Sequence, residues 1–416
     1  MTFSDKSILV IGNGYEVEIV AAMGKVFKKA YYYTPWQHAS PKFQSYAHGL
    51  GFEGIEKVLH PFDYIDKVDI IAFFDIGYGD MAAYLRNHGY TVFGAGKGEK
   101  LEERRFDFRQ IQHRIGLPTQ GTVNLKGTKA LREFLKQNGD RYVKLDIFRG
   151  NIESFYSKNY DSVEMLLDEI DSAFGPMKEE YEFLVEESVE SKIESGMDTH
   201  YSAPVGWIEP TLYGIEWSKN AYIGSFNQQL PDFHLNTKDK LGKVMKGLDY
   251  RGPISTEEKD IGGGLSVIID ITARLPFTFS AGYPDWILNY PEVVWKVARG
   301  EKVTIEPVDK FVGCIPLETT HLDDKWVKLD FDAKLRKEGV KNGRVRLAMA
   351  SCVDGKYFAI PGMPVAYNLV AWGPDVDAVT DTLQGMLDKV DAFGLDKSSA
   401  GNLQKIIDLK KDMGWD

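Results

Sequence analysis

The sequence has little of the chemistry that holds small secreted or zinc-stabilised domains together. Its 416 residues include only two cysteines, Cys314 and Cys352, which excludes a disulfide framework and a cysteine-rich zinc site. No stretch approaches 18 uncharged apolar residues, so no transmembrane helix is expected. The segment from Met1 to Lys6 lacks a long apolar run, so no signal peptide is expected. These absences together predict a cytoplasmic protein.

Positive charge is also scarce. Lys and Arg number 50 against 61 Asp and Glu, which gives a net charge of −11. A general nucleic-acid-binding protein needs clustered Lys and Arg to contact phosphates, so that class is disfavoured, although a local basic pocket for a nucleotide remains compatible. The remaining composition is that of an ordinary globular protein, with 43% hydrophobic and 27% charged residues. A chain of this length is expected to form two to four domains.

Strands and helices alternate in the first hundred residues. Buried strand patterns at 7–12, 29–34, 67–75 and 91–94 are interleaved with helical patterns at 15–27 and 81–88. This alternation predicts a parallel α/β sheet. Ligands of such sheets bind beyond the carboxyl ends of the strands. Gly12, Gly14 and Asp75 follow strands at that edge and are therefore candidate substrate-binding residues.

A dinucleotide-binding motif is the tempting interpretation of Gly12-Asn-Gly14-Tyr-Glu-Val17, but the third glycine is missing. Glu16 and Glu18 fall in the first helical turn, where their carboxylates would repel a pyrophosphate that needs the positive helix end. An oxidoreductase that uses NAD or FAD is therefore disfavoured. A stability measurement with those cofactors would test this alternative.

Two segments near the middle of the chain predict an antiparallel hairpin. Arg251-Gly-Pro-Ile-Ser-Thr-Glu257 and Ile268-Ile-Asp-Ile-Thr-Ala-Arg274 flank a turn at Gly262, Gly263 and Gly264. Alternation along a strand points Asp270 and Thr272 to the same side, where Glu257 of the partner strand can join them. Mg²⁺ prefers oxygen ligands and usually binds one or two carboxylates plus nucleotide phosphates. The plain alternative is a solvated polar face on an ordinary hairpin.

The other expected elements fall into two groups. Before residue 300, helices are expected at 101–115, 129–138, 162–174 and 290–298, and strands at 142–144, 182–187, 196–204 and 206–212. After Gly300 the composition changes, and strands are expected at 303–313, 344–351, 356–361 and 368–373. A helix over 376–393 is expected to end at Gly394 as its C-cap. The last hundred residues are thus expected to form a small β-rich unit with a closing helix.

The order of these pieces resembles the ATP-grasp superfamily and, within it, the phosphoribosylamine–glycine ligases. Leu101 to Thr119 aligns without a gap to the pattern Leu-Glu-x-Ser-Lys-x-Phe-x-Lys followed by a helix and Gly-Ile-Pro-Thr. Arg105 and Arg109 stand where the pattern has lysines. The resemblance implies an N-terminal parallel-sheet (pre-ATP-grasp) domain at 1–100, a two-lobed ATP-grasp core at 101–300 with its small lobe at about 120–190, and a β-rich C-terminal domain at 301–416.

The resemblance also implies a role for individual residues. Arg105, Lys144, Arg149 and Lys219 correspond to groups that neutralise phosphates, Glu186 and Ser188 to the adenine contacts, and Glu194 to the ribose contact. Glu257, Asp270 and Thr272 correspond to the metal ligands, and Arg251 and Arg274 to catalytic arginines near the γ-phosphate. Asp270 replaces the usual Glu and Thr272 the usual Asn. The loop after Lys144 keeps one glycine, Gly150.

The activity that the resemblance implies is an ATP-dependent carboxylate–amine ligase that acts through an acyl phosphate. Its cofactors would be ATP and Mg²⁺, with Mn²⁺ as an alternative ion, and its partners a small carboxylate and a small amine. No membrane or general nucleic-acid partner is expected, and the protein is expected to be a monomer or homodimer. The segments 222–234 and 12–16 depart from the substrate loops of the glycine ligases, so different substrates are expected. A catalytically degenerate nucleotide-binding protein is the alternative.

Overall fold

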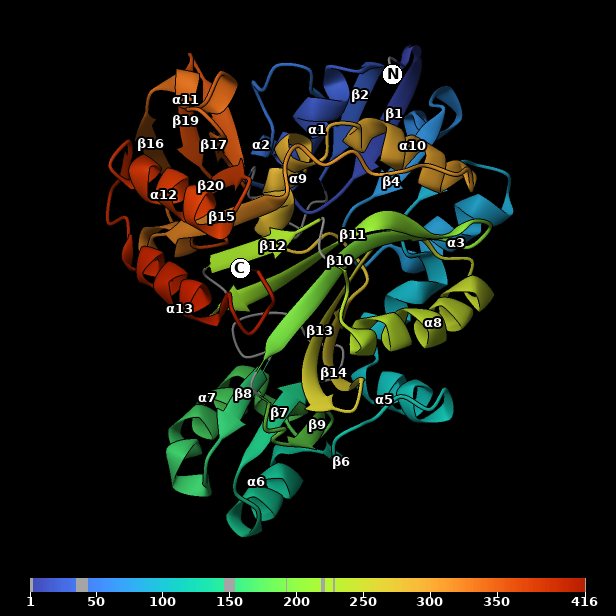
Figure 1. Cartoon of the computed structure of the whole chain (residues 1–416), viewed down its shortest axis with the longest axis vertical. Coiled ribbons are helices and arrows are strands. Elements are labelled where there is room, and N and C mark those ends of the chain that lie inside the picture. Colours follow the sequence, from blue (N-terminus) through green and yellow to red (C-terminus); the bar gives the residue numbers. More distant parts are fainter. Residues whose placement is uncertain are drawn as a thin grey trace.

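The computed structural model describes residues 3–34, 44–145, 154–191, 193–217, 221–226 and 229–415, and the side chains of all these except 44 and 45. Figure 1 shows the N-terminal sheet beside the C-terminal strands and helices at one end of the molecule. A smaller lobe, drawn in green and teal, lies at the other end. The hairpin drawn in yellow runs from the main body down to this lobe.

The N-terminal sheet is parallel throughout, as the alternating pattern predicted. Its central strands are buried, as is typical when helices cover both faces of a parallel sheet. The helices α1 (Val17–Gly24) and α3 (Gly79–Asn87) follow β1 and β4 along the chain. The strand order is β3 (Glu56–Lys57), β2 (Phe27–Tyr33), β1 (Phe3–Ile11), β4 (Ile70–Phe73) and β5 (Val92–Phe93).

The small lobe has its own antiparallel sheet and its own hydrophobic core. The helices α6 (Thr128–Gln137) and α7 (Glu164–Phe174) bury Leu131, Leu167 and Ile170 in that core. An independent core allows the lobe to keep its shape as a unit. The strand order is β6 (Thr122–Lys126), β9 (Glu182–Glu187), β7 (Arg141–Leu145) and β8 (Ser154–Ser157).

An eight-stranded sheet forms the centre of the molecule and contains the predicted hairpin at one edge. The hairpin strands β13 and β14 pair antiparallel, as expected. The C-terminal strands β15, β20 and β17 continue the same sheet, so residues beyond 300 share a core with the hairpin region. The order is β14 (Leu265–Thr272), β13 (Arg251–Gly262), β10 (Glu194–Ser202), β11 (Gly206–Trp217), β12 (Ala221–Ser225), β15 (Phe311–Glu318), β20 (Val365–Gly373) and β17 (Gly343–Arg346).

The remaining elements complete the C-terminal part of the molecule. A second small sheet has the order β18 (Ala350–Val353), β19 (Lys356–Ala359), β16 (Val327–Phe331) and β21 (Val390–Ala392). The helices are α2 (Gln44–Ala47), α4 (Lys100–Glu103), α5 (Arg105–Arg114), α8 (Asp232–Gly247), α9 (Tyr283–Trp286), α10 (Tyr290–Arg299), α11 (Ala333–Lys337), α12 (Val376–Leu387) and α13 (Asn402–Leu409). Among the described helices, none has both the length and the apolar character needed to cross a membrane.

Three expectations about local structure are wrong. The segment 303–310 is not a strand, because its amides bond to separate partners, such as Ile305 N to Glu209 O at 2.8 Å. The helix expected to reach residue 393 ends at Leu387, because Val390 turns into the core as part of β21 and pairs with β16. The long helix α8 was missed, although its buried residues recur every three or four positions.

Candidate functional site

A pocket of about 210 Å³ lies where the small-lobe sheet faces the hairpin. Five residues predicted from the sequence line it: Lys144 on β7, Glu186 on β9, Glu194 on β10, Glu257 on β13 and Asp270 on β14. The fold therefore brings together side chains from five strands and two sheets. The other lining residues are Gln120, Tyr142, Ser154, Glu187, Val189, Lys259 and Ile269.

The hairpin supplies a pair of acids to this pocket. Glu257 and Asp270 are paired in register across β13 and β14, which places their side chains next to each other. The Glu257 carboxylate makes no hydrogen bond or ion pair with another described residue. Burial, and then the negative charges of Glu216 and Asp270, raise the pKa of Glu257 well above its ordinary value. The protein thus concentrates negative charge at this point.

The third predicted metal ligand stands apart from the pair. Thr272 pairs with Ser255 and shares a strand face with Asp270, but it does not line the pocket. Within the described ranges, no group of three or more His, Cys, Asp and Glu side chains is arranged to hold a metal ion. Of the three predicted ligands, the two carboxylates Glu257 and Asp270 line the pocket, which is within the usual number for Mg²⁺ bound together with a nucleotide.

Lys144 and Glu186 form the opposite wall of the pocket. Lys144 Nζ donates to the carbonyl oxygen of Ile269 at 2.5 Å and lies 3.4 Å from Glu186 Oε2. Glu186 is buried and also binds Arg109, whose Nε lies 2.5 Å from Glu186 Oε1. Burial favours a higher pKa for Glu186, but the charges of Lys144 and Arg109 hold that pKa below its ordinary value. Glu186 is therefore a charged anchor for two cations.

The predicted helix at 101–115 is divided at Arg104 into α4 and α5. This division places Arg105 in the first turn of α5, where its Nη1 donates to the carbonyl oxygen of Leu145 at 2.6 Å. Arg105 thus lies at the end of the strand that carries Lys144. Ser188 follows β9, between the two lining residues Glu187 and Val189. Arg149 and Lys219 lie outside the described residues.

A second polar cluster connects the hairpin to the N-terminal sheet. Arg274 Nε lies 3.1 Å from Glu102 Oε1 and 3.6 Å from Asp75 Oδ1. Asn13 Nδ2 donates to Asp75, and Tyr78 donates to Asn13 Oδ1 at 3.2 Å. Burial would lower the pKa of Arg274, but the charge of Glu102 raises that pKa above its ordinary value. The chain from Asp270 to Arg274 therefore leads from the pocket to the carboxyl end of β4.

Gly12 and Gly14 make room for side chains of this same chain. A Cβ on Gly12 would lie 1.2 Å from Glu16 Oε1, and one on Gly14 would lie 1.7 Å from His48 Nδ1. Gly14 N donates to Glu16 Oε2 at 3.1 Å. Burial, and then the charge of Asp75, raise the pKa of Glu16 to about 7. An amide that a pyrophosphate would need is already bound to a carboxylate, which agrees with the argument against a dinucleotide site.

Arg251 lies at the far end of β13 from the acid pair. Its Nε is 3.1 Å from Asp249 Oδ1, and its Nη1 donates to Ala298 O at 3.2 Å. Six residues separate it from Glu257, which corresponds to roughly 20 Å along an extended strand. The structure therefore does not bring Arg251 to the pocket. Its backbone instead joins two sheets, because its carbonyl accepts a bond from Gly94 N at 2.7 Å.

Sequence reasoning assigned no role in this region to three residues: Arg109, which it had only placed in the ungapped pattern, Tyr142 and Lys259. Lys259 lines the pocket, and its Nζ lies 3.6 Å from Glu194 Oε2. Lys259 is two residues after Glu257, and Tyr142 is two residues before Lys144. The period of two along a strand could have found both of them. Arg109 lies one helical turn after Arg105 on α5, and the period of the helix could have indicated it.

Comparison by sequence finds no similar protein for this chain, whereas comparison by structure does. No family model matches it, and no curated protein matches it in sequence. Phosphoribosylamine–glycine ligase from Thermotoga maritima matches in structure with a TM-score of 0.68 and 15% identity, over 94% of this chain and 98% of that one. N5-carboxyaminoimidazole ribonucleotide synthetase from Thermus thermophilus matches with a TM-score of 0.63 and 13% identity, over 92% of this chain and 98% of that one.

A third match is the biotin carboxylase domain of 2-oxoglutarate carboxylase from Hydrogenobacter thermophilus, solved with MgADP, ADP and bicarbonate. Its TM-score is 0.68 at 13% identity, over 96% of this chain and 94% of that one. All three proteins are ATP-grasp enzymes. The chain therefore has the ATP-grasp fold over nearly its whole length, as the resemblance predicted.

Proposed function

We propose that this chain is an ATP-dependent ligase that joins a carboxylate to an amine through an acyl phosphate. The proposal is supported by the ATP-grasp fold and by one observation in particular: Glu257 and Asp270 line the same pocket as Lys144, between two sheets. Phosphoryl transfer asks the protein mainly for positioning and neutralisation of charge. Acids that hold a metal ion and a lysine that holds phosphate meet that requirement.

The acid pair fits a divalent cation. The neighbouring acids raise the pKa of Glu257 after burial does, and a bound cation would relieve that repulsion. Glu257 and Asp270 would hold Mg²⁺, or Mn²⁺ in its place, and the hydroxyl of Thr272 is the nearest further oxygen ligand along β14. When bound, the ion supplies neutralisation of the β- and γ-phosphates.

The other pocket residues would bind the nucleotide. Lys144 and Arg105 would neutralise phosphates, with Arg149 and Lys219 as further cations from positions outside the described residues. The backbone at Glu186 and Ser188 would pair with adenine, and Glu194 would accept hydrogen bonds from the ribose hydroxyls.

The substrates would bind between the pocket and the N-terminal sheet. The planar fork of Arg274 suits a carboxylate that accepts the transferred phosphoryl group. Asp75, Gly12 and Gly14 mark the adjoining place for the amine. The position of Arg251 gives no support for a catalytic role. The substrates are small molecules, with no membrane or nucleic acid involved, and the protein would act in the cytoplasm as a monomer or homodimer.

Thermal melting tests the nucleotide site first. Purified protein is melted with ATP, ADP, AMP-PNP or NAD, each with and without Mg²⁺. A ligand that binds only the folded state adds roughly 2.7 kcal/mol at 100 times its Kd. A Mg²⁺-dependent shift with ATP and none with NAD is expected. The protein is then screened with amino acids and amines for release of ADP, and Asp270→Ala is expected to abolish that release without lowering the melting temperature. Unchanged turnover in that variant would refute the metal assignment.

A protein that binds a nucleotide without turning it over is the second candidate. The position of Thr272 outside the pocket lining favours it, because two of the three predicted metal ligands, Glu257 and Asp270, line the pocket. A Mg²⁺-dependent melting shift with no ADP release, across all carboxylate and amine pairs screened, would support this candidate over the ligase.

A further inference from the structure

The hairpin contains an irregularity beside the acid pair. The register passes from the pair Glu257–Asp270 to the pair Glu258–Ile268, so Ile269 is an extra residue on β14. Such a bulge removes a residue from the ladder and redirects its backbone groups. The carbonyl oxygen of Ile269 accepts hydrogen bonds from Lys144 Nζ and from Arg109 Nη2, the latter at 2.7 Å. The bulge is therefore held from outside the hairpin.

All three guanidinium nitrogens of Arg109 donate hydrogen bonds, and one of them binds the bulge. Its Nε and Nη2 both donate to the carboxylate of Glu186, at 2.5 and 3.3 Å. Its Nη1 donates to Gln112 Oε1 at 2.7 Å, and Gln112 Nε2 in turn donates to the carbonyl oxygen of Ile268 at 3.4 Å. Arg109 is buried and is not among the residues that line the pocket. It therefore lies behind the pocket wall.

The geometry points to Arg109 as a positioning residue that sets the metal site, by fixing the bulge next to Asp270 and, through Glu186, the position of Lys144. One guanidinium on α5 thus connects the hairpin of the central sheet with β9 of the small lobe. Groups that orient metal ligands from behind typically change metal affinity by about 10- to 100-fold when they are altered. This inference rests on the proposed nucleotide site.

The shape of the side chain matters here as well as its charge. The guanidinium reaches Glu186, Ile269 and Gln112 at once because its donors lie in a rigid plane. A lysine keeps the charge but presents donors from one compact group, so it cannot satisfy three acceptors spread around a plane. The arginine at a position where the ligase pattern has lysine accordingly has a physical purpose in this chain.

The test compares Arg109→Lys with Arg114→Lys, a matched change at an exposed position on the same helix. Each protein is melted at a fixed AMP-PNP concentration while Mg²⁺ is titrated. For Arg109→Lys, the Mg²⁺ concentration that gives half of the nucleotide-dependent shift is expected to rise about tenfold or more. The control is expected to match the unaltered chain. Gln112→Met, which removes one acceptor and the bond to Ile268, is expected to move the midpoint in the same direction by less.

The outcomes separate a positioning role from a purely structural one. A lower melting temperature without ligand, together with an unchanged Mg²⁺ midpoint in both Arg109→Lys and Gln112→Met, would overturn the positioning role. If Arg109→Lys does not fold, the midpoint of Gln112→Met decides in the same way. An unaltered chain that shows no Mg²⁺-dependent shift with AMP-PNP would refute the proposed nucleotide site, and the role of Arg109 with it.

Discussion

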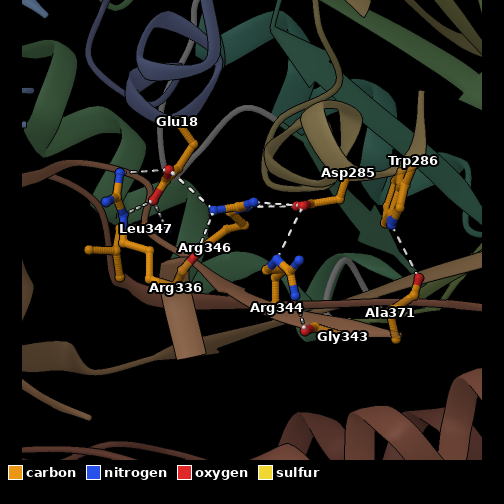
Figure 2. Close-up of polar contacts among 9 residues, drawn as sticks. All are labelled: Glu18, Asp285, Trp286, Arg336, Gly343, Arg344, Arg346, Leu347 and Ala371. Atoms are coloured by element: carbon orange, nitrogen blue, oxygen red, sulfur yellow. Dashed lines mark hydrogen bonds and ion pairs between the residues drawn. The ribbon is translucent and has the colours of Figure 1, made fainter. Parts of the chain in front are cut away.

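Glu18 is a buried acidic side chain and Glu257 a partly buried one, and their surroundings are opposite. Figure 2 shows Glu18 and Asp285 among three arginines, Arg336, Arg344 and Arg346, where N-terminal helix α1 meets α9, α11 and β17. This group is called the arginine cluster below. In the pocket, the charges of Glu216, Asp270 and Glu194 raise the pKa of Glu257 further after burial does, and the opposing effect of Lys144 is smaller. One region neutralises its carboxylates within the protein, and the other accumulates them.

The contacts of the arginine cluster show what complete neutralisation requires. Arg336 donates to both oxygens of Glu18, at 2.7 and 2.9 Å, and the amide of Leu347 donates to it at 3.2 Å. Arg346 donates to both oxygens of Asp285, at 2.7 and 2.6 Å, and lies 3.7 Å from Glu18. Each carboxylate thus has a bidentate partner. A partly buried acid without such a partner, like Glu257, is therefore a better candidate for a ligand site than a buried acid that an arginine neutralises, like Glu18.

The largest expected effect is on the arginine cluster. Glu18→Gln removes the charge that neutralises Arg336 and leaves this buried cation without its counter-ion, whereas Arg346 keeps Asp285. The free energy of unfolding is expected to fall by about 3–5 kcal/mol, measured by urea denaturation. Glu301→Gln, at a half-exposed carboxylate paired with Arg299, is the control and is expected to change stability little. A small loss in Glu18→Gln would mean that the cluster is not a structural ion network.

A Glu-to-Gln substitution in the pocket is expected to change the free energy of unfolding in the opposite direction. Glu257→Gln removes repulsion from Asp270 and Glu216, so the ligand-free protein is expected to gain stability on the order of 1 kcal/mol. The stabilisation by Mg²⁺ and AMP-PNP, roughly 2.7 kcal/mol at 100 times Kd, is expected to disappear. Melting curves with and without both ligands measure the two effects. Glu187→Gln, at another pocket residue, is the control and should keep the ligand shift. Lower ligand-free stability in Glu257→Gln would show that the acid neighbours do not destabilise the pocket.

The dependence of stability on pH is expected to differ between the unaltered chain and Glu257→Gln. The pKa of Glu257 is raised in the folded state by burial and by its acid neighbours, so the folded protein holds that proton more tightly than the unfolded chain. The stabilisation that this proton gives the folded protein is fully present below the ordinary pKa of about 4.3. It is lost as the pH rises towards the raised pKa, by at most about 1.4 kcal/mol per pH unit.

The difference in the free energy of unfolding between the unaltered chain and Glu257→Gln, followed from pH 4.5 to 8, measures the contribution of Glu257. The difference cancels the similar contributions of Glu16 and Glu99, whose pKa values burial raises to about 7. The unaltered chain is expected to lose stability relative to the variant as pH rises. A difference that does not vary with pH would show that the pocket does not raise the pKa of Glu257.

The smallest effect is expected at the edge of the arginine cluster. Arg344 Nε lies 3.7 Å from Asp285 Oδ1, and its side chain is 24% exposed, whereas Arg346 already binds both oxygens of that carboxylate. Arg344→Ala is therefore expected to cost less than about 1 kcal/mol in urea denaturation. A loss as large as that of Glu18→Gln would mean that the third arginine is essential to the network.

Much of the fold and part of the site were predictable, because they depend on patterns within short segments. The period of two along β14 predicted that Asp270 and Thr272 share a side that Glu257 can join from the partner strand, and Glu257 does pair with Asp270. The ungapped pattern from Leu101 to Thr119 indicated the fold, which the structural comparisons confirm. The helix α8 carried its own pattern and could also have been predicted, because its buried residues recur every three or four positions.

Local sequence preferences set which segments become strands and helices and which faces they bury, because those preferences act between residues a few positions apart. Which charges meet depends instead on how the distant elements pack. Arg336 is 318 residues from Glu18, and Arg109 is 160 residues from the carbonyl of Ile269. Whether a buried carboxylate meets an arginine fork or another carboxylate depends on which elements the chain packs together. This packing distinguishes the arginine cluster, whose ion pairs stabilise the fold, from the pocket, whose acidic side chains are proposed to bind a cation.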